Sequence, residues 1–314
     1  MIACNQGGVG SEQTSHESVP IESASSQGLA ENVNSPDSLP DYAQEIANWR
    51  ANRISALKRP RSWTTLVGLT WLNHGESTFG SATHSNVIIS DVAPEDVGVW
   101  TVTGDSVLFK TEQGVDVRLS DQSRFVQGMV RADALGDPHV FHLGSLYWMI
   151  IKRSGSYGVR VWDTMYHART ELTDIPYYNI EPAWKLEATV LPAEDGATIT
   201  MDNAVGQSIE NEIAGYVVSS KDGIDINLIA LDGGPDDLFL IFSDLTTDIE
   251  TYPGGRYMYI PRGDSLGRTV IDFNKAYNPP CAFTAFATCL LPPKSNFIDA
   301  EVSAGEKDYG NHDD

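Results

Sequence analysis

The sequence predicts a mainly β protein: an antiparallel sheet or barrel-like sandwich, with one N-terminal amphipathic helix and a long structured C-terminal loop. Beyond residue 60, short runs rich in Val, Ile, Thr and aromatic residues alternate with Gly, Asp and Pro. Two dipeptides typical of tight hairpins lie between such runs. No helical pattern of about 10 to 15 residues regularly separates the runs, which argues against a doubly wound α/β fold.

The helix is predicted between Pro40 and Pro60, because a helical period occurs there and nowhere else in the chain. Its apolar residues fall close to one helical face, and polar residues occupy the rest of the surface. The apolar face contains Tyr42, Ile46, Trp49 and Leu57.

The hairpins are predicted at Gly104-Asp105 and at Asp222-Gly223, since each pair separates two β-type runs. Antiparallel pairing follows from such short connections. Further strands are expected at residues 147–151, 159–162, 185–191 and 238–242.

The length of 314 residues and an apolar share of 41% are enough for one large core or two modest ones. We expect residues 1–40 to form a disordered tether and residues 41–307 a single β-rich domain, with a subdivision near residue 145 left open. Residues 308–314 form an acidic tail.

The charge excludes one class of partner. Lys and Arg number 21 against 43 Asp and Glu, so the formal net charge is −22, which repels a phosphate backbone. We therefore expect no nucleic-acid partner. No run approaches the roughly 18 apolar residues of a membrane helix, so we expect membrane contact only through a lipid anchor.

The first four residues, Met1 to Cys4, resemble the end of a bacterial lipoprotein signal, which makes Cys4 a lipidation candidate. The basic segment and the apolar run of a complete signal peptide do not precede it, so this expectation requires a truncated start. Residues 5–40 contain no Lys, Arg or aromatic residue and eight serines, as a flexible tether would. The sequence thus favours an exported lipoprotein anchored in the cell envelope. The alternative is a disordered tail with a free Cys4 in a cytoplasmic protein.

The polar residues are densest from Phe242 onward, where Asn, Pro and aromatic side chains crowd together. Such a composition does not continue a sheet or helix, so we expect a long structured loop there. Loops of this kind commonly carry function, although they also cover cores.

This segment resembles the signature of the domain of unknown function 1684 family (DUF1684). The resemblance extends over most of residues 49–307 and includes Trp63, Leu66 to Leu69, Trp71-Leu72, Gly75, Phe79 to Ser81, Arg153, Arg160, Asp163 and Trp184. Two positions depart from the family pattern: residues 152–155 read Lys-Arg-Ser-Gly where Arg-Arg-Gly is usual, and Leu290 replaces a proline. The family supplies no activity.

The candidate site is a cluster of Arg, Asp, Asn, Tyr and Glu side chains that meet if the loop folds back over the sheet. An arginine fork binds a carboxylate or phosphate, and a neighbouring carboxylate is available as a base. The predicted catalytic residues are Arg160, Asp163, Arg256, Asp272, Asn274, Tyr277 and Glu306, and the predicted binding residues are Arg153, Asn278 and Lys307. The alternative is an ion-pair network that only locks the loop.

Cys281 and Cys289 allow three interpretations. In an oxidising compartment they form a small disulfide, which the loop-entropy relation values at about 2.6 kcal/mol. A nucleophilic Cys281 needs a nearby base, and no histidine lies in the motif. Seven intervening residues exceed the usual spacing of zinc ligands, which leaves zinc and a pair of buried thiols as the remaining options.

Signatures of serine hydrolases, nucleotide-binding loops, zinc proteases and calcium loops are missing from the sequence. We therefore expect no metal and no cofactor. The functional hypotheses are a hydrolase-like enzyme acting on a small molecule and, as the alternative, a non-catalytic lipoprotein that binds a ligand or glycan. An enclosed pocket where an arginine meets a carboxylate favours the enzyme, and an open, shallow, polar groove favours the binding protein.

Overall fold

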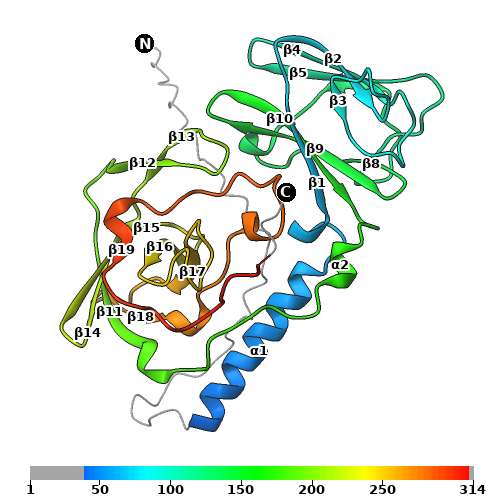
Figure 1. Cartoon of the computed structure of the whole chain (residues 1–314). Helices are drawn as coiled ribbons and strands as arrows, with labels where there is room; N and C mark the ends of the chain where they lie inside the picture. Colours follow the sequence, from blue (N-terminus) through cyan, green and yellow to red (C-terminus); the bar gives the residue numbers. More distant parts are fainter. Residues whose placement is uncertain (1–38, 311–314) are drawn as a thin grey trace, which may run out of the picture.

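A computed structural model describes residues 39–310 of the chain (Figure 1), and β-strands dominate them. The strands pair antiparallel apart from two short parallel contacts, β2 with β3 and β16 with β19. The predicted class, mainly β with antiparallel sheets and one longer helix near the N-terminus, is confirmed.

The helix α1 spans Leu39–Leu57. Tyr42, Ile46 and Leu57 of the predicted apolar face are buried, and Trp49 packs against the outside of the barrel described below. Shorter helices are α2 (Ala168–Glu171), η1 (Trp63–Thr65), η2 (Asp133–Leu135), η3 (Pro182–Trp184), η4 (Phe273–Lys275), η5 (Pro280–Ala282) and η6 (Lys294–Asn296). None of the helices within residues 39–310 is long and apolar enough to span a bilayer.

The N-terminal half forms a sandwich of two sheets around one core. The fully buried aromatic side chains of that core come from both sheets, and Trp100 stacks on Phe109 while Phe141 stacks on Trp148. The first sheet has the order β1 (Leu66–Trp71), β10 (Ser156–Asp163), β9 (Leu146–Arg153), β8 (Phe141–Leu143) and β6 (Arg118–Leu119). The second has the order β3 (Val87–Ile88), β2 (Gly75–Gly80), β4 (Gly98–Thr103), β5 (Ser106–Thr111) and β7 (Gln127–Met129).

The C-terminal half is a nearly closed barrel, because the first and last strands of its sheet contact each other. Figure 1 shows it as a body distinct from the sandwich, with α1 running beside it. The strand order is β17 (Arg256–Pro261), β16 (Asp237–Asp244), β15 (Ile224–Asp232), β14 (Gly215–Lys221), β11 (Lys185–Leu191) and β18 (Arg268–Asp272), and β19 (Phe297–Ile298) joins β16. The hairpin of β12 (Thr198–Asp202) and β13 (Ser208–Glu212) forms a separate two-stranded sheet.

Alternation along the barrel strands divides their side chains between two cores. On β17, Met258 and Ile260 point into the barrel, whereas Tyr257 and Tyr259 point outward. The disulfide segment and the β12–β13 hairpin cover outward residues of three strands, namely Leu231 of β15, Phe239 and Ile241 of β16 and Tyr257 of β17. Within residues 39–310, the outward side chains of β11 and β14 lie outside this cluster and are exposed or half-buried, so one side of the barrel is open.

The predicted loop from Phe242 onward is wrong in its first part, because β17 and β18 lie within it. The apolar alternation of residues 256–261 outweighs the Pro and Gly residues that precede it. Irregular structure does prevail over residues 273–307, where only short helical turns and β19 occur.

Both predicted hairpins are present, as β4–β5 and β14–β15. The sandwich and the barrel have separate cores, with residues 72–161 in one and 184–304 in the other. The number of domains stays a prediction. The tether, Cys4 and residues 311–314 lie outside the described residues.

Candidate functional site

Glu306 is the centre of a buried network that joins α1 to the end of the barrel chain. Arg53 donates from Nε to Glu306 Oε1 at 3.1 Å and from Nη2 to the Asn278 carbonyl at 2.8 Å. The backbone N–H of Asn278 donates to Glu306 Oε2 at 2.7 Å, and the Tyr177 hydroxyl donates to Oε1 at 3.3 Å. Glu306 is fully buried and Arg53 is 7% exposed. Protein groups thus occupy both oxygens of this carboxylate.

Tyr277 lies beside the same network, with its ring 4.6 Å from the Arg53 guanidinium carbon. Burial raises the pKa of Tyr277 well above its ordinary value, and the neighbouring Tyr259 adds to the shift. Burial and then Glu306 likewise raise the pKa of Tyr177. Both phenols therefore stay protonated at neutral pH, which removes them as bases or nucleophiles.

Asp272 and Asn274 form a second buried network, at the N-terminal end of α1. The Tyr42 hydroxyl donates to Asp272 Oδ1 at 2.8 Å, and Asn274 donates to the same oxygen from its backbone N–H at 3.1 Å. Asn274 also exchanges two 2.9 Å hydrogen bonds with the backbone of Glu181. Burial, followed by the hydrogen bond to Asp272, raises the pKa of Tyr42. This network fastens the helix to the barrel.

Arg256 and Asp244 form a third network, whose ion pair is completely buried. Arg256 Nη2 lies 2.7 Å from Asp244 Oδ2 and 2.9 Å from the Val302 carbonyl, and Nη1 donates to the Ala304 carbonyl. The Thr246 hydroxyl donates to Asp244 Oδ1 at 2.6 Å. The guanidinium thus holds the last irregular segment to strands β16 and β17.

The remaining candidates lie elsewhere. Arg160 of β10 is buried, donates to Thr288 Oγ1 at 3.3 Å and lies over the Trp63 ring; burial lowers its pKa to about 9, which leaves it charged at neutral pH. Asp163 accepts a hydrogen bond from the turn that follows β10. Arg153 pairs with Asp133 at 2.8 Å.

Lys307 is the surface member of the predicted set. Its Nζ pairs with Glu250 at 2.7 Å and lies 4.4 Å from the centre of the Tyr178 ring. The sequence-predicted residues are therefore distributed over three buried networks, the sandwich and the surface, rather than gathered around one pocket.

Sequence reasoning missed the partners that satisfy these groups, above all Arg53, Tyr42 and Asp244. One signal was present in the helix: Arg53 follows Trp49 by four residues and precedes Leu57 by four, so it lies on the apolar face. A charged residue in that position needs a buried partner of opposite charge.

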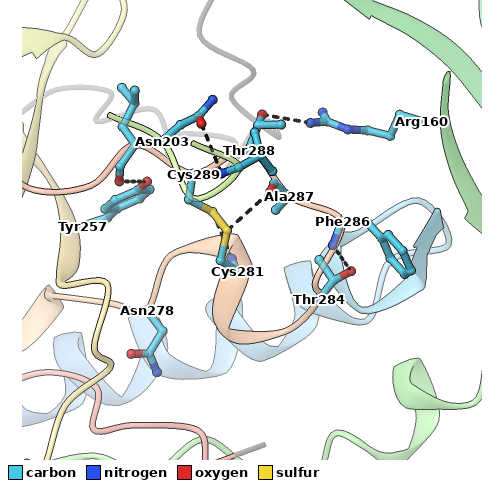
Figure 2. Close-up of a disulfide and its surroundings, with 12 residues drawn as sticks. Arg160, Asn203, Tyr257, Asn278, Cys281, Thr284, Phe286, Ala287, Thr288 and Cys289 are labelled. Atoms are coloured by element: carbon cyan, nitrogen blue, oxygen red, sulfur yellow. Dashed lines mark hydrogen bonds between the residues drawn. A yellow bond between two sulfur atoms is a disulfide. The ribbon is translucent and has the colours of Figure 1, made fainter. Parts of the chain in front are cut away.

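Cys281 and Cys289 are joined as a disulfide, with their Cα atoms 6.2 Å apart (Figure 2). The short loop that it closes contacts the sandwich at two points. Thr284 Oγ1 donates to the Leu66 carbonyl of β1 at 2.9 Å, and Thr288 accepts from Arg160, as Figure 2 also shows. The disulfide therefore shapes a loop that bridges the barrel and the sandwich.

An open groove of about 930 Å³ lies on the uncovered outer face of the barrel, over β18, β11, β14 and β15. Because side chains alternate along a strand, the outward residues of these four strands line it. Those outward residues are Glu187 and Thr189 of β11, Val218 and Ser220 of β14, Asp225 and Asn227 of β15, and Arg268 and Val270 of β18.

The groove offers mostly uncharged or acidic hydrogen-bonding groups. Its arginine, Arg268, is engaged by Asp264, with Nε 2.9 Å from Oδ2. Within the described part of the chain, the side chains of Thr189, Ser220 and Asn227 have no hydrogen-bond partner and face solvent beside Glu187 and Asp225. Such a surface suits a ligand that both donates and accepts hydrogen bonds.

The sequence does contain one signal for the groove. Polar residues such as Asp225 and Asn227 occur at every second position of a strand. Such alternation predicts a strand with one polar face and does not by itself predict a ligand site. In residues 39–310, no group of three or more His, Cys, Asp or Glu side chains is arranged to hold a metal ion.

We expect Glu306→Ala to destabilise the protein by about 3–5 kcal/mol, because it leaves the Arg53 guanidinium buried without its carboxylate. Lys307→Ala removes an ion pair at the next position, on the surface, and should have little effect. Urea unfolding followed by tryptophan fluorescence measures both. Equal, small losses for the two variants would show that the buried network contributes nothing.

Reduction of the Cys281–Cys289 disulfide should lower the unfolding free energy by about 2.6 kcal/mol, because the unfolded chain regains the freedom of the closed loop. Thermal melts with and without dithiothreitol measure the change. The double variant Cys281→Ser/Cys289→Ser serves as the control, since its melt should not respond to the reductant. An unchanged melt of the fully reduced wild-type protein would contradict this expectation.

Comparison with known proteins finds a family model that matches the C-terminal half. Residues 170–307 match the family model described as Protein of unknown function (DUF1684). The upstream residues of the sequence resemblance, from Trp63 to Asp163, lie outside that range.

An uncharacterised protein of Haloarcula marismortui, whose structure was determined by NMR in solution, is 30% identical to this chain. The similarity covers 46% of this chain and 82% of that chain, with a TM-score of 0.38. No curated protein matches. The match over residues 170–307 supports a DUF1684 domain in the C-terminal half of the chain.

Proposed function

We propose that this chain is a non-catalytic binding protein of the cell envelope and that its ligand occupies the outer groove of the barrel. The observation that carries the proposal is the contrast between the two sets of polar residues. Arg256, Asp272 and Glu306 of the C-terminal segment are buried against protein partners, whereas the groove presents its polar groups to solvent.

The sealed networks argue against the hydrolase-like alternative. A general base must come within hydrogen-bond reach of a substrate proton. Glu306 and Asp272 are already engaged by Arg53 and Tyr42 in the interior, and burial keeps Tyr277 protonated.

The groove lacks the arrangement that activates a carboxylate. Glu187 and Asp225 are exposed, and among residues 39–310 neither forms an ion pair with a His, Lys or Arg side chain. Catalytic carboxylates usually depend on burial or on a charged neighbour for their reactivity. These two are suited to hydrogen bonding with a ligand instead.

The location in the envelope is supported by the disulfide, since disulfides persist in oxidising compartments. A lipid on Cys4 would attach the chain to the membrane. Attachment there would bring the groove near ligands at the membrane surface.

The location has its own test. Expressed with a bacterial lipoprotein leader ahead of Cys4, the protein should sediment with membranes, and Cys4→Ala should release it into the soluble fraction. Radiolabelled palmitate should label the first protein and not the second. Equal release of the wild-type protein and the Cys4→Ala variant would contradict the lipid anchor.

The groove is tested by thermal shift of the full chain against three probe sets: neutral saccharides, organic acids and amines. We expect a neutral saccharide to raise the melting temperature, and Ser220→Ala/Asn227→Ala to abolish that rise. Thr200→Ala, a similarly exposed polar residue on β12, is the matched control and should retain it.

Three results would count against the proposal. The rise in melting temperature could persist in the groove variant, all three probe sets could leave the protein unaffected, or the saccharide could be consumed, as judged by chromatography of the incubated sample. Consumption of the saccharide would favour the hydrolase-like enzyme instead.

A further inference from the structure

One end of the groove continues into an apolar shelf made of Tyr216 and Leu191. The two residues are cross-strand partners on β14 and β11, and their side chains are 37% and 45% exposed. Side chains directly opposite one another in an antiparallel pair lie close together. An exposed aromatic ring beside an exposed leucine therefore forms one continuous apolar surface.

The shelf lies on the same face of the sheet as the groove. On β14, Tyr216 precedes Val218 and Ser220 at intervals of two residues, and on β11 Leu191 follows Thr189 in the same way. Residues two apart on a strand point to the same side. The polar groove and the apolar shelf are thus a single surface along β11 and β14.

We infer that the ligand of this surface is an uncharged oligosaccharide, bound with one sugar ring against Tyr216 and Leu191 and further hydroxyls in the groove. The inference rests on the proposed function and names its ligand class. A sugar ring has apolar C–H faces and a rim of hydroxyls, and it therefore needs both kinds of surface at once. Tyrosine supplies a broad apolar ring together with a polar tip.

The length of the surface favours more than one sugar unit. Ser220 lies four positions after Tyr216, which corresponds to about 13 Å along the strand. The hydrogen-bonding groups match hydroxyls in both directions, because Asn227 and Ser220 donate and accept while Glu187 accepts.

The charges of the groove disfavour an anion. Glu187 and Asp225 repel it, and Arg268 of the same groove is already engaged by Asp264. The same two carboxylates attract a cation, which is the competing ligand that the test below includes. A neutral ligand with hydroxyl groups avoids the repulsion and donates hydrogen bonds to both carboxylates.

The test uses the full chain on an array of neutral, acidic and amine-bearing oligosaccharides, followed by calorimetric titration with the neutral oligosaccharide that binds best. Tyr216→Ala should weaken binding about three- to tenfold, as expected for the loss of one ring contact. Tyr216→Phe should retain binding. Tyr166→Ala is the matched control, because Tyr166 is 39% exposed and lies after β10 in the sandwich.

The outcomes separate this inference from the proposed function. If Asn227→Ala weakens binding and Tyr216→Ala does not, the shelf has no role in binding. The ligand would then contact only the groove. If neither variant changes the affinity, the groove itself is the wrong site. Preferential binding of amine-bearing probes, with an affinity that falls steeply as the salt concentration rises, would show that the ligand is cationic and would contradict the inference.

Discussion

The structure depends on the requirement that charges taken out of water be paired. Arg256 and Asp244 lie wholly inside the protein, and removing either partner would leave the other charge without compensation. The carbonyls of Val302 and Ala304 accept further hydrogen bonds from the guanidinium, which ties the final segment of the chain to the barrel. Arg53 and Glu306 apply the same constraint to α1.

Local patterns made much of the fold predictable. Turn dipeptides located β4–β5 and β14–β15, and helical spacing located α1, because these signals depend on neighbouring residues alone. The Pro and Gly content around Arg256 predicts a loop, but the alternation of Tyr257 to Ile260 produces strand β17 there instead. The order of the barrel strands depends on pairings between distant residues, which no local pattern contains.

The candidate site was less predictable than the fold. The sequence identified Glu306, Asp272 and Arg256 as unusual, since polar side chains in an irregular segment must be satisfied by something. A sequence contains no distances, so it does not show whether each of these side chains is satisfied by a ligand or by the protein itself. In the structure the protein supplies the partners, which are Arg53 for Glu306, Tyr42 for Asp272 and Asp244 for Arg256. No local pattern predicts the groove, because its residues come from four strands spread over residues 187–270 of the chain.

A sealed interior holds the chain together, and an open surface is free to bind. Native-state hydrogen exchange at the amide of Asn278, whose N–H donates to Glu306, tests whether the interior is sealed. We expect this amide to exchange only with global unfolding, at a free energy equal to that of the whole protein. Exchange through a local opening of much lower free energy would contradict it, because the buried carboxylates would then be accessible to a substrate.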